Sequence, residues 1–327
     1  MGARVIICDD SRLARNFLAR SLPKGFADEQ HFAASGREAL EQVQDGQGDL
    51  LFLDLNMPDL DGYQVLAALH ARQSDCRVIV ISGDIQPKAR AQVMEMGALA
   101  FLPKPLERQT LLDALFELKL ISAAQRQHPG KETPTGEGPD RMEVLREVAN
   151  VAMGRAAGTL AGIYNVFVQI PVPRIQALPA RELQDLLEQW QTRPGHQVIS
   201  QGFVGAGISG EVLMELSSDE AHGMARLMGM QVEQAEEEAL MIALSTILIG
   251  ICLKGMASQL QLAFSQGHPI ILERDGIRNL QNMDDRNVLC IRFGYQVAEH
   301  NLHQELVLAI TPASLPALEQ RLKQLVN

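Results

Sequence analysis

The first 120 residues alternate short apolar runs with longer amphipathic segments. Runs of four or five mainly apolar residues predict strands that are buried on both faces, whereas apolar residues three or four apart predict helices. Strands that alternate with helices fold as a parallel sheet covered by helices on both sides. The runs are RVIIC (4–8), HFAA (31–34), LLFL (50–53), RVIVI (77–81) and ALAFL (98–102). We therefore expect residues 1–122 to form a five-stranded, doubly wound α/β domain.

Polar residues that favour helix starts precede three of the amphipathic segments. Ser and Asp side chains accept hydrogen bonds from the free amides of a first helical turn. Ser11, Ser35 and Asp61 each stand directly before a helical pattern. The pattern predicts helices over 12–22, 36–44, 62–71, 87–96 and 107–120.

A change of composition separates this region from the rest of the chain. Residues 125–141 read QRQHPGKETPTGEGPDR, which is rich in Pro, Gly and charge and has almost no apolar side chains. Such a segment is typical of a flexible linker. We expect a first domain over 1–122, a linker over 123–140 and a second domain over 141–327.

The second domain mixes helical and strand patterns without regular alternation. Its two long helical segments are rich in small residues, and each is followed by strand patterns, which indicates a pseudo-two-fold repeat. The expected helices are 143–163, 181–190, a pair within 219–264, and 313–325. The expected strands are two runs within 198–217 joined by a Gly-rich turn, and 269–272, 288–297 and 304–311, with a Pro-rich patch at 170–179. We expect an α+β domain.

Composition places the chain among soluble globular proteins, with 46% hydrophobic and 21% charged residues. The longest apolar stretch, 239–253, contains Ser245 and Thr246 and is shorter than the ~20 residues of a membrane span. It predicts a buried helix rather than membrane insertion. The first ten residues, MGARVIICDD, do not resemble a secretion signal. We expect a cytoplasmic protein.

The charge balance argues against a nucleic-acid partner. Residues 1–122 carry 13 basic and 17 acidic side chains, a net −4, and residues 123–327 carry 16 and 23, a net −7. Lys and Arg contacts to phosphates supply most of the affinity for DNA. An acidic second domain is therefore not expected to bind DNA.

Acidic residues follow neighbouring strands of the predicted sheet. Asp9 and Asp10 come after the first run, and Asp54 comes after the third. Ligands of open α/β sheets bind at the carboxyl ends of the strands, so these carboxylates are expected to converge there. Mutual repulsion calls for a cation, and oxygen ligands suit Mg²⁺. Asp54 is then a candidate nucleophile toward a phosphoryl donor, with Ser82 and Lys104 as candidate phosphate contacts.

The motifs ICDDS (7–11), FLDLNMPDLDG (52–62), VISG (80–83) and FLPKPL (101–106) resemble the receiver domain of two-component response regulators, a flavodoxin/CheY-like fold. The resemblance implies phosphorylation on Asp54 by a sensor histidine kinase of the CheA type. It also implies that Mg²⁺ is held by Asp10 directly, by Asp9 through water, and by the main-chain carbonyl of Asn56.

The same resemblance implies further roles in the first domain. Ser82 and Lys104 would contact the phosphate, and the Lys104–Pro105 bond would be cis. Phe101 would stand at the position of the aromatic switch residue, although core packing is an alternative for an aromatic beside a strand.

The first long helix of the second domain carries the segment EVLREVANVAMGRAAGTLAG. Glu147 and Asn150 are three residues apart, so they share a helix face. A solvated polar face is the ordinary reading of such a pair. Together with Pro173, however, the pattern resembles the CheC/CheX/FliY family of phosphatases that act on phosphorylated chemotaxis receivers. The resemblance implies that Asn150 positions the attacking water and that Glu147 contacts the receiver lysine.

Two features depart from that family's pattern. The second long helix, ALMIALSTILIGICLKGM, has Ala243 and Thr246 where the Glu and Asn would stand, so this copy is expected to be structural only. Glu143, four residues before Glu147, stands where the family often has Asp or Ser.

Two functions follow for the second domain. In the first, it is an aspartyl-phosphate phosphatase acting on Asp54 of the same chain, on Asp54 across a homodimer, or on a separate phosphorylated receiver. In the second, it is a non-catalytic interaction surface controlled by phosphorylation of Asp54. The motif favours the enzyme.

Overall fold

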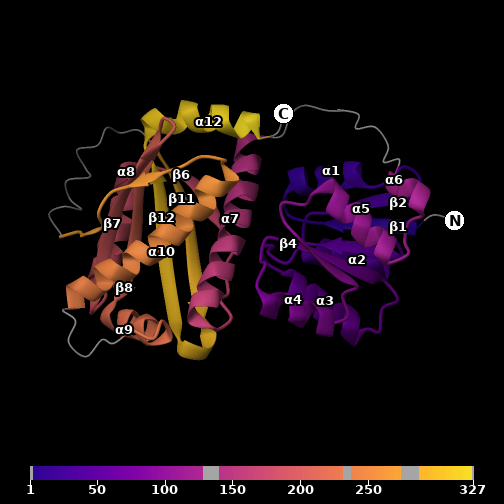
Figure 1. Cartoon of the computed structure of the whole chain (residues 1–327), viewed down its shortest axis with the longest axis horizontal. Coiled ribbons are helices and arrows are strands. Elements are labelled where there is room, and N and C mark those ends of the chain that lie inside the picture. Colours follow the sequence, from indigo (N-terminus) through magenta and orange to yellow (C-terminus); the bar gives the residue numbers. More distant parts are fainter. Residues whose placement is uncertain (1–2, 128–139, 231–236, 274–286, 326–327) are drawn as a thin grey trace. The chain divides into compact units, whose positions relative to one another are not determined.

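The structure, a computed structural model, describes residues 3–127, 140–230, 237–273 and 287–325. The chain divides into two compact units, Met1–Gly154 and Arg155–Asn327 (Figure 1). The division falls within helix α7 (Arg141–Tyr164), whose first part belongs to the first unit. The expected linker lies mostly outside the described residues, but Ala123–Gln127 form a short helix, α6. The proposed domain limits stay a prediction.

The first unit contains the predicted five-stranded parallel sheet, in the order β2-β1-β3-β4-β5. Its strands are β1 (Ala3–Cys8), β2 (Ala27–Ala33), β3 (Leu50–Leu53), β4 (Arg77–Ser82) and β5 (Ala100–Pro103). Strand β2 begins four residues before the expected start. Its first residues, ADEQ, are polar because β2 is an edge strand, so an apolar run could not reveal them.

Helices cover both faces of this sheet, as predicted, and Ser11, Ser35 and Asp61 are all N-caps. The helices are α1 (Arg12–Ser21), α2 (Gly36–Gln44), α3 (Gly62–Ala71), α4 (Pro87–Glu95) and α5 (Arg108–Glu117). Alternate residues of β1 enter different cores: Ile6 packs with residues of α2, α3 and α4, and Ile7 packs with residues of α1 and α5. Burial on both sides explains the continuous apolar runs.

The second unit contains a seven-stranded antiparallel sheet in the order β10-β7-β8-β12-β11-β6, with β9 paired to β7. Its strands are β6 (Arg174–Leu178), β7 (His196–Gly205), β8 (Ile208–Ser217), β9 (Ser265–Gln266), β10 (Ile270–Ile271), β11 (Val288–Val297) and β12 (Leu302–Ile310). The sequence pattern missed β6 and β9. Strand β6 lies at the sheet edge directly after Pro171 and Pro173, where proline is tolerated and the apolar alternation is weak.

The order of this sheet confirms the pseudo-two-fold repeat. Exchanging β6 with β10, β7 with β11 and β8 with β12 reproduces the same order read backwards. Helix α7 precedes β6 as α10 (Glu237–Gln259) precedes β10, and α9 (Ser218–Leu227) follows β8 as α12 (Leu315–Gln324) follows β12. The two long helices therefore hold equivalent places in the chain order of two related halves.

Helices lie on both faces of the antiparallel sheet. On one face, Leu187 and Trp190 of α8 (Ala180–Thr192) pack with strand residues such as Leu213. On the other, Cys252 of α10 is 2.8 Å from the Tyr295 hydroxyl of β11. Helix α10 is long and apolar enough to span a membrane by composition, but half of its apolar window is buried in the protein, as in a core helix.

Candidate phosphorylation and metal site

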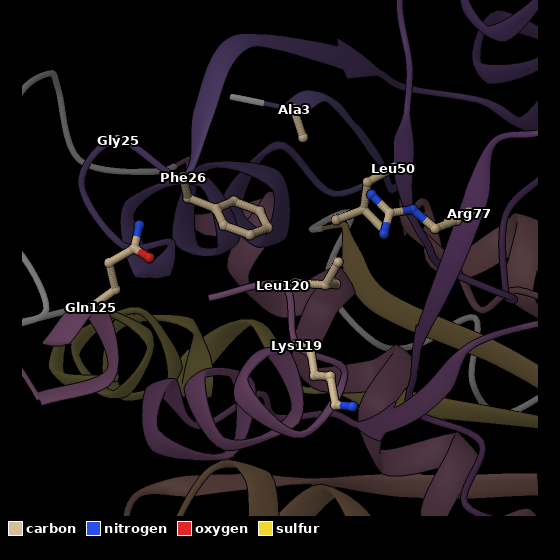
Figure 2. Close-up of a pocket in the computed structure, with 8 residues that line it drawn as sticks. All are labelled: Ala3, Gly25, Phe26, Leu50, Arg77, Lys119, Leu120 and Gln125. Atoms are coloured by element: carbon tan, nitrogen blue, oxygen red, sulfur yellow. The ribbon is translucent and has the colours of Figure 1, made fainter. Parts of the chain in front are cut away.

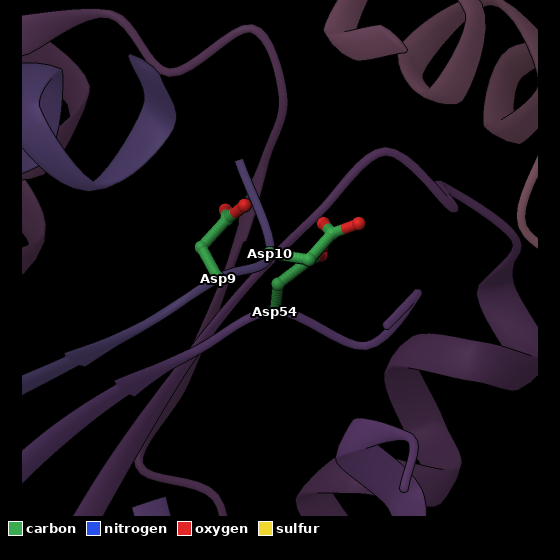
Figure 3. Close-up of side chains that lie close together, drawn as sticks. All are labelled: Asp9, Asp10 and Asp54. Atoms are coloured by element: carbon green, nitrogen blue, oxygen red, sulfur yellow. The ribbon is translucent and has the colours of Figure 1, made fainter. Parts of the chain in front are cut away.

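Three carboxylates meet at one edge of the parallel sheet (Figure 3). Cys8 at the end of β1 pairs with Leu53 at the end of β3, so the residues that follow both strands reach the same edge. One oxygen from each of Asp9, Asp10 and Asp54 lies within 4.8 Å of the others. Asp54 is 1% exposed. The sequence prediction that these acids converge is confirmed.

Lys104 lies among these acids. Its Nζ is 2.7 Å from an Asp9 oxygen and 3.2 Å from Asp54 Oδ2. The Lys104 amide donates to the Ser82 carbonyl, which ties the lysine to the end of β4, and the Lys104–Pro105 bond is cis, as expected. A buried ammonium at this distance supplies a counter-charge for the acids and for any anion added to Asp54.

Burial and neighbouring charges shift the pKa of Asp10, Asp54 and Lys104. Burial, then the charges of Asp9 and Asp54, raises the pKa of Asp10 to about 7. Burial also raises the pKa of Asp54 above its ordinary value, although the Lys104 ammonium opposes the shift. Burial lowers the pKa of Lys104, but the surrounding carboxylates outweigh burial and hold that pKa well above its ordinary value. One lysine does not neutralise three carboxylates.

The residues fit a divalent cation. Asp54 Oδ2 is buried and lies 3.2 Å from Lys104 Nζ, and a carboxylate oxygen with one such neighbour keeps a lone pair for a metal. In the part of the chain that the structure describes, the group consists of three carboxylates without His or Cys, and such oxygen ligands suit Mg²⁺. Asp9, Asp10 and Asp54 would hold the ion. Asn56 follows β3 and is partly exposed, and a role for its carbonyl stays a prediction.

Ser82 and Phe101 lie on neighbouring strands beside this cluster. Ser82 is fully buried at the end of β4, and its Oγ accepts a hydrogen bond from the Asp84 amide at 3.1 Å. The hydroxyl hydrogen is therefore available to an added phosphate oxygen. Phe101 pairs with Val80 across β5 and β4 and packs, partly buried, on the core. This packing fits either a switch residue or a core aromatic.

A separate cavity of about 360 Å³ lies at the other end of the parallel strands (Figure 2). It is lined by Ala3, Gly25, Phe26, Leu50, Arg77, Lys119, Leu120 and Gln125. These include the first residues of β1, β3 and β4, whereas the acids follow the last residues of β1 and β3. The cavity therefore shares no residue with the acidic site.

The family model described as the response regulator receiver domain matches residues 5–116. Those residues contain the acidic cluster, Ser82 and Lys104. Residues 5–116 are a response regulator receiver domain. The response regulator MprA of Mycolicibacterium vanbaalenii is 34% identical over 113 residues, which cover 34% of this chain and 48% of that protein. The match thus spans about half the length of these relatives.

Solved structures are also similar to parts of the chain. The signal receiver domain of the response regulator NarL from Mycobacterium tuberculosis is 32% identical and covers 36% of this chain and 95% of its own, with a TM-score of 0.34. Thermotoga maritima FliY is 18% identical and covers 58% of this chain and 99% of its own, with a TM-score of 0.41.

Within the first unit, the face of α7 that carries Glu147 contacts the receiver site. Glu147 Oε1 is 3.5 Å from Lys104 Nζ, and its side chain is 19% exposed. Its other oxygen is buried without a hydrogen-bond partner. Burial raises the pKa of Glu147, Lys104 lowers it, and the receiver acids raise it further, for a net rise. Asn150, one turn along, is 9% exposed. The solvated-face reading of this pair is wrong.

The structure adds contacts that the sequence pattern did not single out. Glu143, noted only as a departure from the family pattern, lies 3.3 Å from the exposed Arg12 guanidinium of the receiver. Gly83, directly after Ser82, lies against the backbone of α7 at Val151 and Gly154. A glycine inside a long helix costs about 1 kcal/mol relative to alanine, and this cost was the available signal for Gly154.

Proposed function

We propose that the chain is a response regulator of a chemotaxis-type phosphorelay that is phosphorylated on Asp54 and whose second domain hydrolyses receiver aspartyl phosphate. The first part rests on the receiver domain, because such domains take their phosphoryl group from a histidine kinase, here of the CheA type. Asp54 would attack the donor phosphorus through Oδ2, since Oδ1 accepts a hydrogen bond from the Leu55 amide. A bound Mg²⁺ would neutralise phosphate charge, while Lys104 and Ser82 would hold the phosphate oxygens.

The contact between Glu147 and Lys104 carries the proposal for hydrolysis. By the resemblance to the CheC/CheX/FliY family, the Glu of the helix motif contacts the receiver lysine, and in this chain the two groups are 3.5 Å apart. Asn150 lies one turn farther along the same face of α7, so we expect its amide to lie beside the same site. A neutral amide can hold a water in line with the aspartyl phosphate without adding negative charge to an anionic site.

The substrate that these contacts favour is Asp54 of the same chain. Glu147, Lys104 and Asp54 all lie in the unit Met1–Gly154. The water that Asn150 holds would attack phosphorus, the P–O bond to Asp54 would break, and Asp54 would leave as a carboxylate. The products are inorganic phosphate and the unmodified receiver.

The lifetime of the aspartyl phosphate tests this function. The full chain, its Asn150→Ala variant and its Thr246→Ala variant are phosphorylated with a histidine kinase or with acetyl phosphate, and loss of phosphate is followed after the donor is removed. Loss of an aligning group costs about 100-fold in rate, so Asn150→Ala should lengthen the lifetime to that extent. Thr246 is exposed at the equivalent position of α10, so its variant should match the parent. Equal lifetimes in all three proteins would refute the enzyme.

The second function, a phosphorylation-controlled interaction surface, is favoured by a different observation. The face of α10 equivalent to the Glu147 face is exposed at Ala243 and Thr246 and has neither catalytic group. Binding of a motor, receptor or kinase component that depends on Asp54 but survives Asn150→Ala would favour this function. We expect the protein to be cytoplasmic. Both experiments use the full chain. Its oligomeric state is measured as well, because that separates action within one chain from action across a homodimer.

A further inference from the structure

Two glycines bring the receiver loop after β4 into backbone contact with α7. A Cβ atom added to Gly154 would lie 2.1 Å from the Gly83 carbonyl oxygen and 2.7 Å from the Asp84 amide nitrogen. A Cβ atom added to Gly83 would lie 3.2 Å from the Val151 Cα. Both glycines are buried and both belong to the first unit. We call this pair the glycine seat.

The same helix contains a glycine without such a contact. Gly162 is exposed, and a Cβ atom there would meet nothing within 4 Å. Each glycine in a helix interior costs about 1 kcal/mol relative to alanine. At Gly154 this cost has a steric reason, because no side chain fits between the helix and the loop. At Gly162 there is no such steric reason. Gly162→Ala is therefore a matched control for Gly154→Ala.

We propose that the glycine seat sets how far Glu147 and Asn150 reach into the phosphate site, and that it restricts this face of α7 to receivers with a small residue directly after the phosphate-binding hydroxyl. The proposal rests on the function proposed above and names its substrate class. Gly83 and Gly154 are positioning residues, because neither has a side chain that could touch the phosphate.

The geometry connects the seat to the site on both sides. Gly154 is four residues from Asn150 and seven from Glu147, so all three share one face of the helix. A rise of about 1.5 Å per residue places them about 6 Å and 10 Å away along the helix axis. On the receiver side, Gly83 is bonded to Ser82, whose carbonyl accepts from the Lys104 amide. A displacement at the seat must therefore move the catalytic face relative to Lys104.

The distances predict a graded size filter. At Gly154 a methyl group at 2.1 Å from a backbone oxygen must push the helix away by more than about 1 Å, and a misplacement of that size costs about 100-fold in rate. At Gly83 a methyl group at 3.2 Å requires a shift of a few tenths of an ångström, so alanine is accepted with a small loss. Larger side chains at position 83 are rejected.

The test uses the phosphorylated full chain in four variants: Gly154→Ala, Gly162→Ala, Gly83→Ala and Gly83→Leu. The aspartyl-phosphate lifetime and the amide hydrogen exchange of residues 83–86 are measured for each. Gly154→Ala and Gly83→Leu should lengthen the lifetime about 10- to 100-fold and speed exchange in the loop. Gly83→Ala should change both by less than about threefold, and Gly162→Ala should change neither.

The proposal is overturned if Gly154→Ala matches Gly162→Ala in both measurements, or if Gly83→Leu matches the parent. Asn150→Ala separates this failure from a failure of the enzyme, because it should lengthen the lifetime without changing exchange at residues 83–86. If Asn150→Ala has no effect on the lifetime, hydrolysis by this domain is refuted. Amide hydrogen exchange in Gly154→Ala and Gly162→Ala then still tests whether the glycine seat positions α7. Thermal melts identify a variant that does not fold. If Gly154→Ala does not fold, the comparison of Gly83→Ala with Gly83→Leu tests the proposal, because neither variant alters α7.

Discussion

Helices α7 and α10 begin the two related halves of the repeat but differ in chemistry at a few positions. Where α7 has Glu147 and Asn150, α10 has Ala243 and Thr246, and the same alignment pairs Gly154 with Gly250. Buried residues such as Leu244 and Leu248 keep the core pattern of α10. Ala243 and Thr246 are exposed, so their identity costs the fold little. The fold of such a repeat is thus kept by its buried face, and its chemistry resides in the residues that the core does not use.

The largest effect is expected when the phosphorylation site is removed, because the comparison of α7 with α10 depends on phosphorylated Asp54. Asp54→Asn should abolish phosphorylation of the chain, because an amide does not form the aspartyl phosphate. Phosphate incorporation is measured by intact-mass spectrometry after treatment with acetyl phosphate. Asp59→Asn, an exposed change on the same loop, should be labelled like the parent. Labelling of Asp54→Asn would place the phosphoacceptor elsewhere.

Giving α7 the chemistry of α10 should have the next largest effect. The double variant Glu147→Ala with Asn150→Thr should slow loss of the aspartyl phosphate by about 100-fold, since the water loses its aligning amide. Circular dichroism should confirm an unchanged helix content, because α10 tolerates the same residues. A lifetime like that of the parent would mean that α7 and α10 are functionally alike.

Removal of the metal should destabilise the receiver. A ligand that binds only the folded state at one hundred times its dissociation constant stabilises it by about 2.7 kcal/mol. Adding Mg²⁺ to chelator-treated protein should raise the free energy of unfolding accordingly, and Asp10→Asn should lose most of this gain. The free energy is measured by urea unfolding. An equal gain in Asp10→Asn would exclude this residue as a ligand.

The ionisation of the acidic site predicts a smaller dependence on pH. Burial raises the pKa of Asp10 to about 7, so the folded state binds a proton that the unfolded state has released above its ordinary pKa of 3.8. The contribution of Asp10 to the free energy of unfolding is greatest below pH 4 and falls as the pH rises toward 7. Metal-free protein should lose about 2.5 kcal/mol between pH 5 and 7.5, since the loss runs over about two pH units below the folded pKa and one unit is worth about 1.4 kcal/mol. Mg²⁺ should flatten this slope, and a slope of the opposite sign would contradict the assignment.

The smallest effect is expected from the reverse exchange in α10. Ala243→Glu with Thr246→Asn should change the free energy of unfolding by less than about 0.5 kcal/mol, because both positions are exposed. The lifetime of phosphorylated Asp54 should also stay unchanged. A loss above 2 kcal/mol, a value of about the size that core changes produce, would show that these two positions serve the fold.

The sequence predicted the structure most clearly where a single physical rule determines the local fold. Burial on both faces made β1, β3 and β4 into continuous apolar runs, and local capping chemistry marked the helix starts at Ser11 and Ser35. The convergence of Asp9 and Asp54 followed from the parallel order of the strands.

Other features depend on partners distant in the chain. Edge strand β6 is stabilised by pairing with β11 rather than by its own apolar pattern, so proline and polar residues hid it. The contact between Glu147 and Lys104 joins residues 43 positions apart, and only the family resemblance suggested it. The fit between Gly83 and Gly154 involves no side chain, so the unfavourable placement of a glycine inside α7 was its one signal in the sequence.

Trp190 has a practical consequence for all of these experiments. It is the single tryptophan of the sequence, it is 1% exposed, and it packs in the core of the second unit. Excitation at wavelengths absorbed by tryptophan but not by tyrosine therefore observes that unit and is blind to unfolding of the receiver, which contains Tyr63. Denaturation followed by fluorescence and by circular dichroism would yield two curves from one sample. Their separation would measure how strongly melting of one half of the molecule depends on the other.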